Sequence, residues 1–262
     1  MQHVRTASVA LLAVAAVAAG TIAFAPSAGA AKKPVPITVL VTNDDGVTAP
    51  GIDALVQALR GAKNTKVVVV APATNQTNTG GATTPGTLPT APATTASGYA
   101  ATAVQGYPAD TVTAALDQLG VKPNVVMSGI NAGQNYGPIT ALSGTIGAAR
   151  MAARRGIPAV AFSQQAGNAP QFADTGKLAV AWLAKHRAAL AKKPKTAPTT
   201  IESYNVPNCP SGRSRGVLMV ATATALPATP VTVDCTATGP KPTTDFDAFN
   251  EGYAALSPVP VG

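Results

Sequence analysis

The stretch Ile37-Thr38-Val39-Leu40-Val41-Thr42-Asn43-Asp44-Asp45-Gly46 sets the interpretation of the whole chain. Its first half has the apolar, β-branched composition of a strand that is buried on both faces, as in a parallel sheet. Its second half places two adjacent carboxylates where the strand gives way to a loop. Like charges this close resist joint ionisation, and a bound metal or a shared proton relieves the repulsion. The aspartate pair therefore indicates a metal site, with a shared proton as the alternative.

The residues that follow predict an α/β fold. Apolar side chains recur with helical spacing from Ile52 to Leu59, and a second β-branched strand is expected over residues 66–71. Together with the first strand they form a βαβ unit, for which a right-handed crossover is expected. In such sheets ligands bind beyond the carboxyl ends of the strands, which is where Asp44 and Asp45 fall.

Strands and helices continue to alternate up to residue 195. Residues 73–102 are rich in Thr, Ala, Gly and Pro and are expected to form a loop or mobile flap, or a solvated linker. From Thr199 onward only strand-like segments are expected. The predicted fold is a three-layer α/β/α Rossmann-like core with a mainly parallel sheet (37–195) and a C-terminal antiparallel β extension (199–262), in a single domain over 37–262. The further helices are expected over 107–120, from Ser143 and over 172–190, and the further strands over 124–127, 157–162, 201–206, 217–224 and 230–235.

Composition narrows the class of partner. Hydrophobic residues make up 46% of the 262 residues but aromatic residues only 4%, so the core must consist of Ala, Val, Leu and Ile. The formal net charge of +8 suits an anionic substrate. The basic residues are scattered and base-stacking aromatics are few, so no nucleic acid polymer is expected as a partner.

Residues 1–30 have the features of a cleaved signal peptide. His3 and Arg5 precede an apolar run over 7–25, and Ala28-Gly29-Ala30 supplies a small-x-small cleavage pattern. A retained membrane anchor fits less well, because the run is rich in alanine and the cleavage pattern follows directly. We expect an exported protein, secreted or in the cell envelope or periplasm, with no stable membrane anchor after cleavage and with residues 31–36 as a linker.

Cysteine and histidine are scarce. Cys209 and Cys235 could form a disulfide in an exported protein, or could both stay free. Without the leader, His186 is the only histidine, which excludes a histidine-rich zinc site. A Ser-His-Asp triad would have to use His186. His186 lies in a strongly helical segment between Lys185 and Arg187, so we expect an exposed helix residue there.

Two further segments bear on the chemistry. The loop after the predicted strand at 124–127 is rich in glycine and amides, and the helix after it begins with Ser143-Gly144-Thr145. Backbone N–H groups at a helix start, with two hydroxyl groups beside them, form a phosphate site; an ordinary helix cap accounts for only one of the hydroxyls. Asp110, at the start of the preceding helix, suits a helix N-terminus.

The order of these segments resembles the SurE family of survival-protein nucleotidases, which are metal-dependent acid phosphatases that act on nucleoside monophosphates. The resemblance spans roughly residues 37 to 258. It rests on Thr42-Asn43-Asp44-Asp45-Gly46, Ala49-Pro50-Gly51, Val70-Ala71-Pro72 with Asn75, Gly106 with Pro108 and Asp110, Ser128-Gly129-Ile130-Asn131, Gly133 with Asn135 and Gly137, Ser143-Gly144-Thr145, Asn205-Val206-Pro207, Thr244-Asp245-Phe246 and Glu251-Gly252-Tyr253.

The resemblance implies a set of site residues. The metal ligands would be Asp44, Asp45, Thr77 and Asn131, all of which offer oxygen and so suit Mg²⁺ or Mn²⁺. The phosphate-binding positions would be Asn135 and the helix start Ser143-Gly144-Thr145. A homodimer or larger homo-oligomer is also implied.

The chain departs from the family pattern in three places. Thr77-Asn78 stands where the family has Ser-Gly, Pro138-Ile139-Thr140 replaces acidic residues, and Ala73-Thr74-Asn75-Gln76 replaces an Asp-Arg-Asn-Arg type of loop.

The expected function is metal-dependent hydrolysis of nucleoside monophosphates to nucleoside and phosphate, as a 5'/3'-nucleotidase. One of Asp44 and Asp45 would ligate the metal most directly, and the other would orient or deprotonate a water or protonate the leaving oxygen. A phosphoenzyme formed on an aspartate ranks lower, because adjacent side chains tend to diverge. The alternatives are an exported nucleotide- or phosphate-binding protein with weak or no turnover, and a phosphatase for polyphosphate or another phosphate ester.

Overall fold

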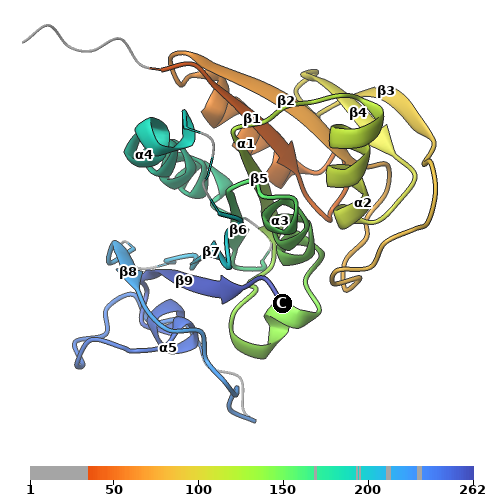
Figure 1. Cartoon of the computed structure of the whole chain (residues 1–262). Coiled ribbons are helices and arrows are strands. Elements are labelled where there is room, and N and C mark those ends of the chain that lie inside the picture. Colours follow the sequence, from red (N-terminus) through yellow and green to blue (C-terminus); the bar gives the residue numbers. More distant parts are fainter. Residues whose placement is uncertain (1–34, 168–169, 193, 195, 211–213, 229–231) are drawn as a thin grey trace, which may run out of the picture. The chain divides into compact units, whose positions relative to one another are not determined.

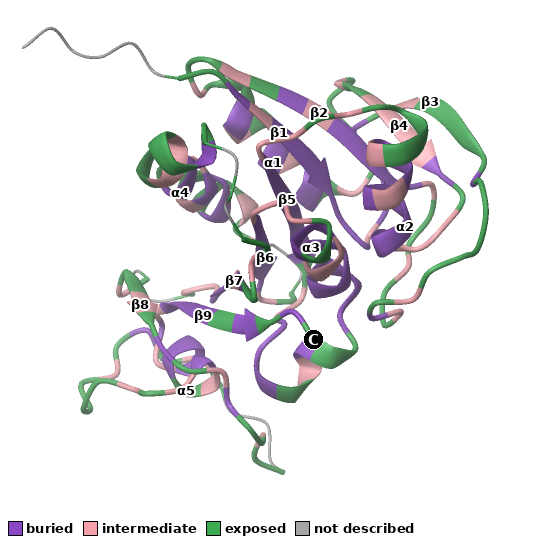
Figure 2. Ribbon diagram, viewed as in Figure 1, coloured by how far each residue is buried: buried purple, intermediate pink, exposed green. Residues whose placement is uncertain are grey.

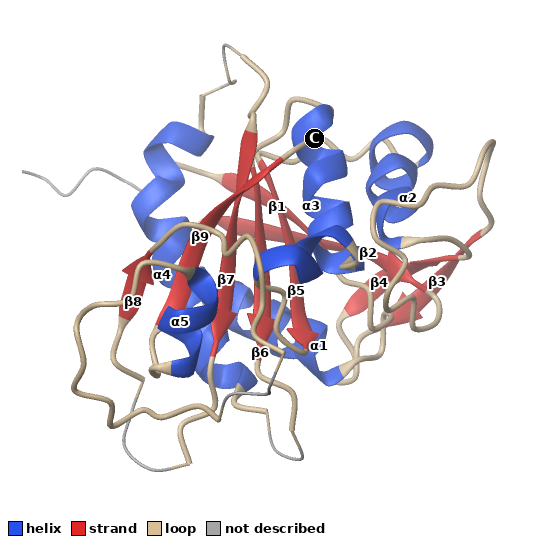
Figure 3. Cartoon of the chain, turned by 90° about the horizontal axis from the view of Figure 1, so that it is seen from below, coloured by secondary structure: helices blue, strands red, loops and turns tan. Residues whose placement is uncertain are grey.

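Strand β1 (Ile37–Thr42) lies inside a mixed sheet and separates two groups of strands. The computed structural model describes residues 35–167, 170–192, 194, 196–210, 214–228 and 232–262 (Figure 1). Within these residues the sheet has nine strands in the order β3-β4-β2-β1-β5-β6-β7-β9-β8. Figure 3 shows them as one continuous sheet with β3 and β8 at its two margins.

The remaining elements have the following bounds. The helices are α1 (Pro50–Arg60), α2 (Pro108–Thr113), the π-helical turn η1 (Ala114–Gln118), the 3-10 turn η2 (Gly137–Ala141), α3 (Gly144–Arg154), α4 (Phe172–Leu190) and α5 (Asp245–Asn250). The strands are β2 (Thr65–Pro72), β3 (Thr90–Thr94), β4 (Ala100–Val104), β5 (Val125–Ala132), β6 (Ala159–Gln164), β7 (Thr200–Val206), β8 (Val217–Met219) and β9 (Ala254–Pro260).

Helices cover both faces of the sheet, which confirms the predicted three-layer core. Val39 and Val41 of β1 belong to the apolar cluster that includes α1 and α4, whereas Leu40 belongs to the cluster that includes α2 and α3. Since successive side chains of a strand point to opposite faces, the uninterrupted apolar run of β1 follows from burial on both sides. The central strands are buried along most of their length in Figure 2, while β3 is exposed.

Two of the crossover connections have opposite hands. The pairs β1–β2 and β6–β7 are both parallel, and α1 and α4 pack against each other on the same face. The chain moves toward the β3 margin in β1–α1–β2 and toward the β8 margin in β6–α4–β7. Connections on one face that move in opposite directions must differ in hand, so one of them departs from the right-handed rule. The β5–α3–β6 connection reverses both face and direction and therefore shares the hand of β1–α1–β2.

The prediction of a loop over residues 73–102 is wrong for its second half. Strands β3 and β4 form an antiparallel pair there, and β4 also pairs in parallel with β2. The sequence of β3, TAPAT, carries small side chains and no apolar alternation, because the strand is a solvent-exposed sheet margin. Its backbone hydrogen bonds, rather than a hydrophobic face, define it as a strand.

The helix expected over residues 107–120 has different bounds in the structure, and two residues on helices can be compared with their predictions. The helix expected to run to Gly120 is α-helical only over Pro108–Thr113 and continues as a π-helical turn. Asp110 accepts hydrogen bonds from the backbone N–H groups of Tyr107 (3.0 Å) and Thr84 (2.9 Å), so the prediction that it suits a helix N-terminus is confirmed. His186 is half-buried rather than exposed, since its ring stacks on Trp182 with centroids 4.3 Å apart.

The C-terminal region extends the same sheet. The antiparallel part begins later than the predicted residue 199. Strand β7 (200–206) is still parallel to β6, and the first antiparallel pairing on this side of the sheet is between β7 and β9. Strand β8 ends at Met219 rather than 224 and is parallel to β9. The strand expected over 230–235 lies partly outside the described residues, and its described part, 232–235, is not a strand. Helix α5 and strand β9 were not predicted.

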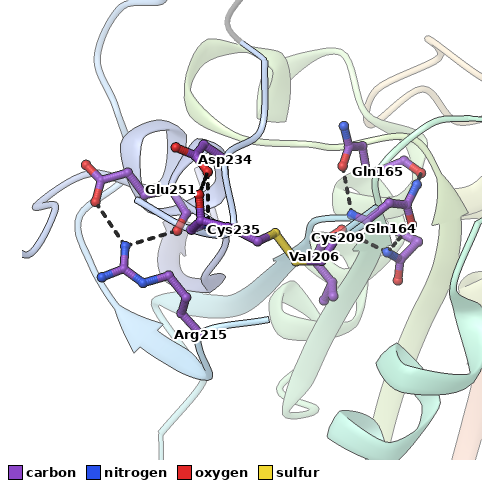
Figure 4. Close-up of a disulfide and its surroundings, with 10 residues drawn as sticks. Gln164, Gln165, Val206, Cys209, Arg215, Asp234, Cys235 and Glu251 are labelled. Carbon is purple, nitrogen blue, oxygen red and sulfur yellow. Dashed lines mark hydrogen bonds and ion pairs between the residues drawn. A yellow bond between two sulfur atoms is a disulfide. The ribbon is translucent and has the colours of Figure 1, made fainter. Parts of the chain in front are cut away.

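The two cysteines form a disulfide. Cys209 follows β7 and Cys235 precedes α5, and their Cα atoms are 5.8 Å apart (Figure 4). On one side of the bond, the Asn208 side chain accepts from Gln164 Nε2 (2.8 Å) and its backbone N–H donates to Gln165 Oε1 (2.7 Å). The disulfide therefore ties the C-terminal segment to the ends of β6 and β7.

We expect the variant with both Cys209→Ser and Cys235→Ser to lose about 3 kcal/mol of unfolding free energy, because the bond closes a loop of 26 residues that would otherwise be free in the unfolded chain. Urea denaturation of the oxidised protein and of the variant measures the difference. A dithiol reductant should bring the two curves together, and equal curves before reduction would contradict the prediction.

The described residues from Val35 onward belong to one compact unit, Pro34–Gly262. Searched over the same residues, no helix combines the length and apolar character needed to cross a membrane. The predicted signal peptide (1–30) and all but the last two residues of the predicted linker (31–36) lie outside the described residues.

Candidate metal and phosphate site

Asp44 follows β1, the strand at which the direction of strand addition along the sheet reverses. From β1 the chain moves to β2 on one side, while β5, β6 and β7 follow on the other, so the ends of β1 and β5 border the crevice where α/β sheets bind ligands. The Asp44 side chain is 2% exposed, and its Oδ1 accepts a hydrogen bond of 2.5 Å from the hydroxyl of Thr145, in the first turn of α3. The backbone of Thr145 also favours the ionised form of Asp44 and so lowers its pKa. The N-terminus of α3 thus faces a carboxylate of the protein itself.

Burial makes the charge of Asp44 unfavourable. It raises the pKa of the Asp44 carboxyl from 3.8 to about 6, against the hydrogen bonds from Thr145, and the negative charge of Asp45 adds to the rise. Burial also raises the pKa of Asp45, whereas a hydrogen bond from the backbone of Ala132 lowers it. Within the described ranges the side-chain ion pairs involve Asp117, Asp174 and Glu251, and neither Asp44 nor Asp45 takes part in one.

Asp45 connects the end of β1 to the end of β5. Its Oδ2 accepts a hydrogen bond of 3.0 Å from the N–H of Ala132, the residue after Asn131. Asn131 is 8% exposed, and its Nδ2 donates to the carbonyl of Gly133 at 2.8 Å, which fixes the orientation of the amide. The structure therefore brings three of the four predicted ligands, Asp44, Asp45 and Asn131, to neighbouring strand ends.

A β-bulge determines where Asn131 points. The pairing of β5 with β6 runs from Ser128 opposite Ala161 to Asn131 opposite Ser163, so β5 contains one extra residue. Because side chains alternate along a strand, the extra residue brings Asn131 to the face that Ser128 occupies. The bulge contains Gly129, with φ of +128°, and a Cβ there would lie 2.2 Å from the carbonyl oxygen of Phe162. Only glycine fits this position.

The loop that carries Thr77 passes beside Asp44. The N–H of Gln76 donates to the carbonyl of Asp44 at 2.7 Å, and the N–H of Gly80 donates to the carbonyl of Leu142 at 2.9 Å. Thr77 itself is exposed, and its N–H is bonded to the Asn75 side chain. The loop is therefore held between the end of β1 and the start of α3, next to Asp44.

The start of α3 approaches Asp44 closely. A Cβ on Gly144 would lie 2.8 Å from the Cβ of Asp44, so this approach requires glycine. The Ser143 hydroxyl accepts a hydrogen bond from the N–H of Ile146 (3.2 Å) and still has a proton to donate. Thr145 has no exposed surface, and its hydroxyl is committed to Asp44. The structure thus gives Thr145 the role of holding Asp44.

Asn135 is held from two strands. Its Nδ2 donates to the hydroxyl of Ser163 (2.9 Å), and its backbone N–H donates to Oδ1 of Asn205 (2.6 Å). One of its two amide hydrogens is therefore used in a hydrogen bond to Ser163. The side chain is 5% exposed.

The donor set fits a hard cation. Two carboxylates that no cationic side chain of the described residues neutralises lie beside an amide, and all of these groups offer oxygen. Mg²⁺ and Mn²⁺ take carboxylate and amide oxygens. In addition, the amide oxygen of the fully buried Asn43 has no hydrogen-bond partner among the described residues. This strand end therefore carries several oxygen atoms whose negative charge or lone pairs no protein group neutralises.

Comparison with known proteins matches residues 39–227 to the family described as "Survival protein SurE". The chain belongs to the SurE family. It is 35% identical to the "5'/3'-nucleotidase SurE" of Yersinia pestis (strain Pestoides F) over 241 residues, which cover 86% of this chain and 90% of the relative. The protein of the same name from Yersinia pseudotuberculosis (strain YPIII) is 34% identical with the same coverage. The SurE protein of Aquifex aeolicus superposes with a TM-score of 0.70 and 27% identity, over 86% of this chain and 94% of that one.

SurE membership confirms the predicted family, the mixed α/β fold with its antiparallel C-terminal pairing, and the reaction class: the chain is a phosphomonoester hydrolase. Sequence reasoning did not assign roles to three fully buried polar residues around the site, Ser163, Asn205 and Asp245. Asn205 and Asp245 stand in segments quoted for the SurE resemblance, so a search for polar residues in those segments would have found them; Ser163 carried no such signal.

Proposed function

We propose that this SurE protein is a metal-dependent phosphomonoesterase that hydrolyses nucleoside monophosphates to nucleoside and phosphate. The observation that carries the proposal is the buried, un-neutralised carboxylate of Asp44, next to Asp45 and held against the start of α3. The names of the Yersinia relatives support the nucleotide as substrate. The signal-peptide pattern of residues 1–30 supports action outside the cytoplasm.

Asp44, Asp45, Asn131 and Thr77 would hold the cation, Mg²⁺ or Mn²⁺. When bound, the cation neutralises phosphoryl charge and makes water more acidic. Thr145 keeps Asp44 oriented through the hydrogen bond from its hydroxyl.

The protein groups around the phosphoryl site have separate tasks. Ser143 donates its hydroxyl proton to one phosphoryl oxygen, and the N–H of Gly144 and the free amide hydrogen of Asn135 donate to others. Asp45 is the more exposed carboxylate of the pair, so we assign to it the proton of the attacking water. Asp44 stays fixed by Thr145.

The test is an assay of purified protein on 5'- and 3'-nucleoside monophosphates and polyphosphate, before and after EDTA treatment. We expect hydrolysis of the monophosphates that EDTA abolishes and that added Mg²⁺ or Mn²⁺ restores, because the ligand oxygens belong to the active site. Turnover that EDTA leaves unchanged would contradict the metal requirement. Phosphate binding without any turnover would favour the exported binding protein, and selective turnover of polyphosphate would favour the other phosphatase.

A further inference from the structure

A row of polar side chains crosses three neighbouring strands at their carboxyl ends. Asn131 of β5 pairs with Ser163 of β6, which pairs with Asn205 of β7. Residues opposite each other in a parallel sheet point to the same face, and here it is the face covered by α3. Ser163 and Asn205 are fully buried. Buried polar groups lower stability unless they are hydrogen-bonded, so the partners of this row are informative.

Both buried members of the row bind Asn135. The Asn205 side chain accepts from the backbone N–H of Asn135 (2.6 Å) and donates to its carbonyl (3.3 Å), and so pairs with the backbone as a neighbouring strand would. Ser163 accepts from the Asn135 side chain at 2.9 Å. The row therefore fixes both the backbone and the side chain of one residue.

The same loop has a second anchor two residues later. The N–H of Gly137 donates to Oδ2 of Asp245 at 3.0 Å, and Oδ1 of the fully buried Asp245 accepts from the N–H groups of Ala223 (2.8 Å) and Phe246 (2.9 Å). Asp245 holds the loop to the C-terminal segment, whereas Asn205 holds it to the sheet.

We infer that Asn205 is a positioning residue, which fixes Asn135 at a set distance from Asn131 and so determines the affinity for the phosphoryl group. The inference rests on the proposed function. Asn131 and Asn205 are two strands apart, roughly 10 Å at the usual spacing of strands, and a sheet is stiff in that direction. A cation held by Asn131 and a phosphoryl group held by Asn135 would therefore both be positioned by the same rigid part of the sheet. Pre-ordering of this kind strengthens binding because less motion is lost when the ligand arrives.

Asn205→Ala removes both bonds to the Asn135 backbone. We expect KM for a nucleoside monophosphate and Kd for inorganic phosphate to rise about tenfold, with kcat within about threefold, since the lost contact serves ground state and transition state alike. Asn205→Asp keeps an acceptor for the Asn135 N–H, but it sets a carboxylate oxygen against the Asn135 carbonyl and a negative charge near the phosphate contact, so KM should rise at least as much as in the alanine variant. Steady-state kinetics and titration calorimetry with phosphate, both with Mn²⁺ present, measure these changes.

Asn124 provides the matched control. Its side chain accepts from the N–H of Thr38 (2.8 Å) and donates to the carbonyl of Leu190 (3.1 Å), so it also joins backbone segments at two points, but at the opposite edge of the sheet. Asn124→Ala should lower Tm without changing KM or Kd.

The inference is overturned if Asn205→Ala leaves KM and Kd within twofold of the parent protein, or if Asn124→Ala raises them equally. Failure of the proposed function looks different. If the unsubstituted protein binds phosphate but has no turnover, the proposed reaction is wrong, and the Kd for phosphate still tests the role of Asn205. If the unsubstituted protein has neither activity nor phosphate binding, both the proposed function and the inference are overturned.

Discussion

Asp44→Asn will abolish most of the activity and stabilise the metal-free protein. The amide keeps an oxygen that can accept from the Thr145 hydroxyl, but it removes the negative charge that would hold the cation. We expect kcat to fall about a thousandfold, the scale seen when one charge-stabilising group is removed from an active site.

The stability change follows from the pKa of Asp44. Its folded value, about 6, lies above the unfolded value of 3.8, so the ionised carboxylate lowers stability as the pH rises through 6 and has no such effect below 3.8. The two values differ by roughly 2 pH units at about 1.4 kcal/mol each, so Asp44→Asn should raise the unfolding free energy by about 3 kcal/mol at pH 8 in EDTA. At pH 4 the gain should be nearly absent.

Urea denaturation at the two pH values measures this gain, and Asp117→Asn is the control. Asp117 is exposed and pairs with Arg155 at the surface, so its substitution should leave kcat unchanged and should not stabilise the protein at pH 8. An Asp44→Asn protein with full activity would refute the metal role. One that loses stability at pH 8 would refute the account of a strained buried charge.

Gly129→Ala will destabilise the protein more than any surface substitution. The new Cβ would lie 2.2 Å from the carbonyl oxygen of Phe162 on the neighbouring strand, and alanine disfavours a φ of +128°. Since the obstacle is backbone, β5 and β6 must separate or the bulge must rearrange. We expect a loss of about 4 kcal/mol or more of unfolding free energy, or failure to accumulate as folded protein.

Gly239→Ala is the matched control, because a Cβ there meets nothing within 4 Å and the backbone is not in the left-handed region. Its unfolding free energy should stay within about 0.5 kcal/mol of the parent protein. Circular dichroism during thermal and urea denaturation compares the two. Equal stability of both variants would show that the bulge is not fixed by Gly129.

The elements that the sequence predicted best are those whose burial leaves a clear apolar pattern, either a helical period or an uninterrupted run. Helix α4 has the expected bounds of 172 and 190, and β1 follows its apolar run. Strand β3 could not be foreseen, because an exposed margin needs only backbone pairing and tolerates Thr, Ala and Pro. Strand β9 and helix α5 escaped notice because interpretation of the C-terminal region relied on strand-like composition alone.

At the site, the sequence indicated which groups are present but not how they are paired. The adjacent aspartates and the Ser143-Gly144-Thr145 helix start could be identified from composition and position. That Thr145 donates to Asp44 depends on how closely α3 approaches β1, which no local pattern encodes. The positions of Asn131 and Asn205 likewise depend on register across strands that are far apart in the chain.

The opposite hands of β1–α1–β2 and β6–α4–β7 leave room for the site. If the second crossover had the hand of the first, α4 would run next to α3 on the face where Ser163 and Asn205 lie. Those side chains would then face a second helix instead of Asn135, and the loop through Asn135 would have no sheet surface to rest on. A chain in which β6–α4–β7 had the hand of β1–α1–β2 could keep its sheet and its aspartates and still lack a wall for its substrate, so the path of one connection limits which face can carry a site.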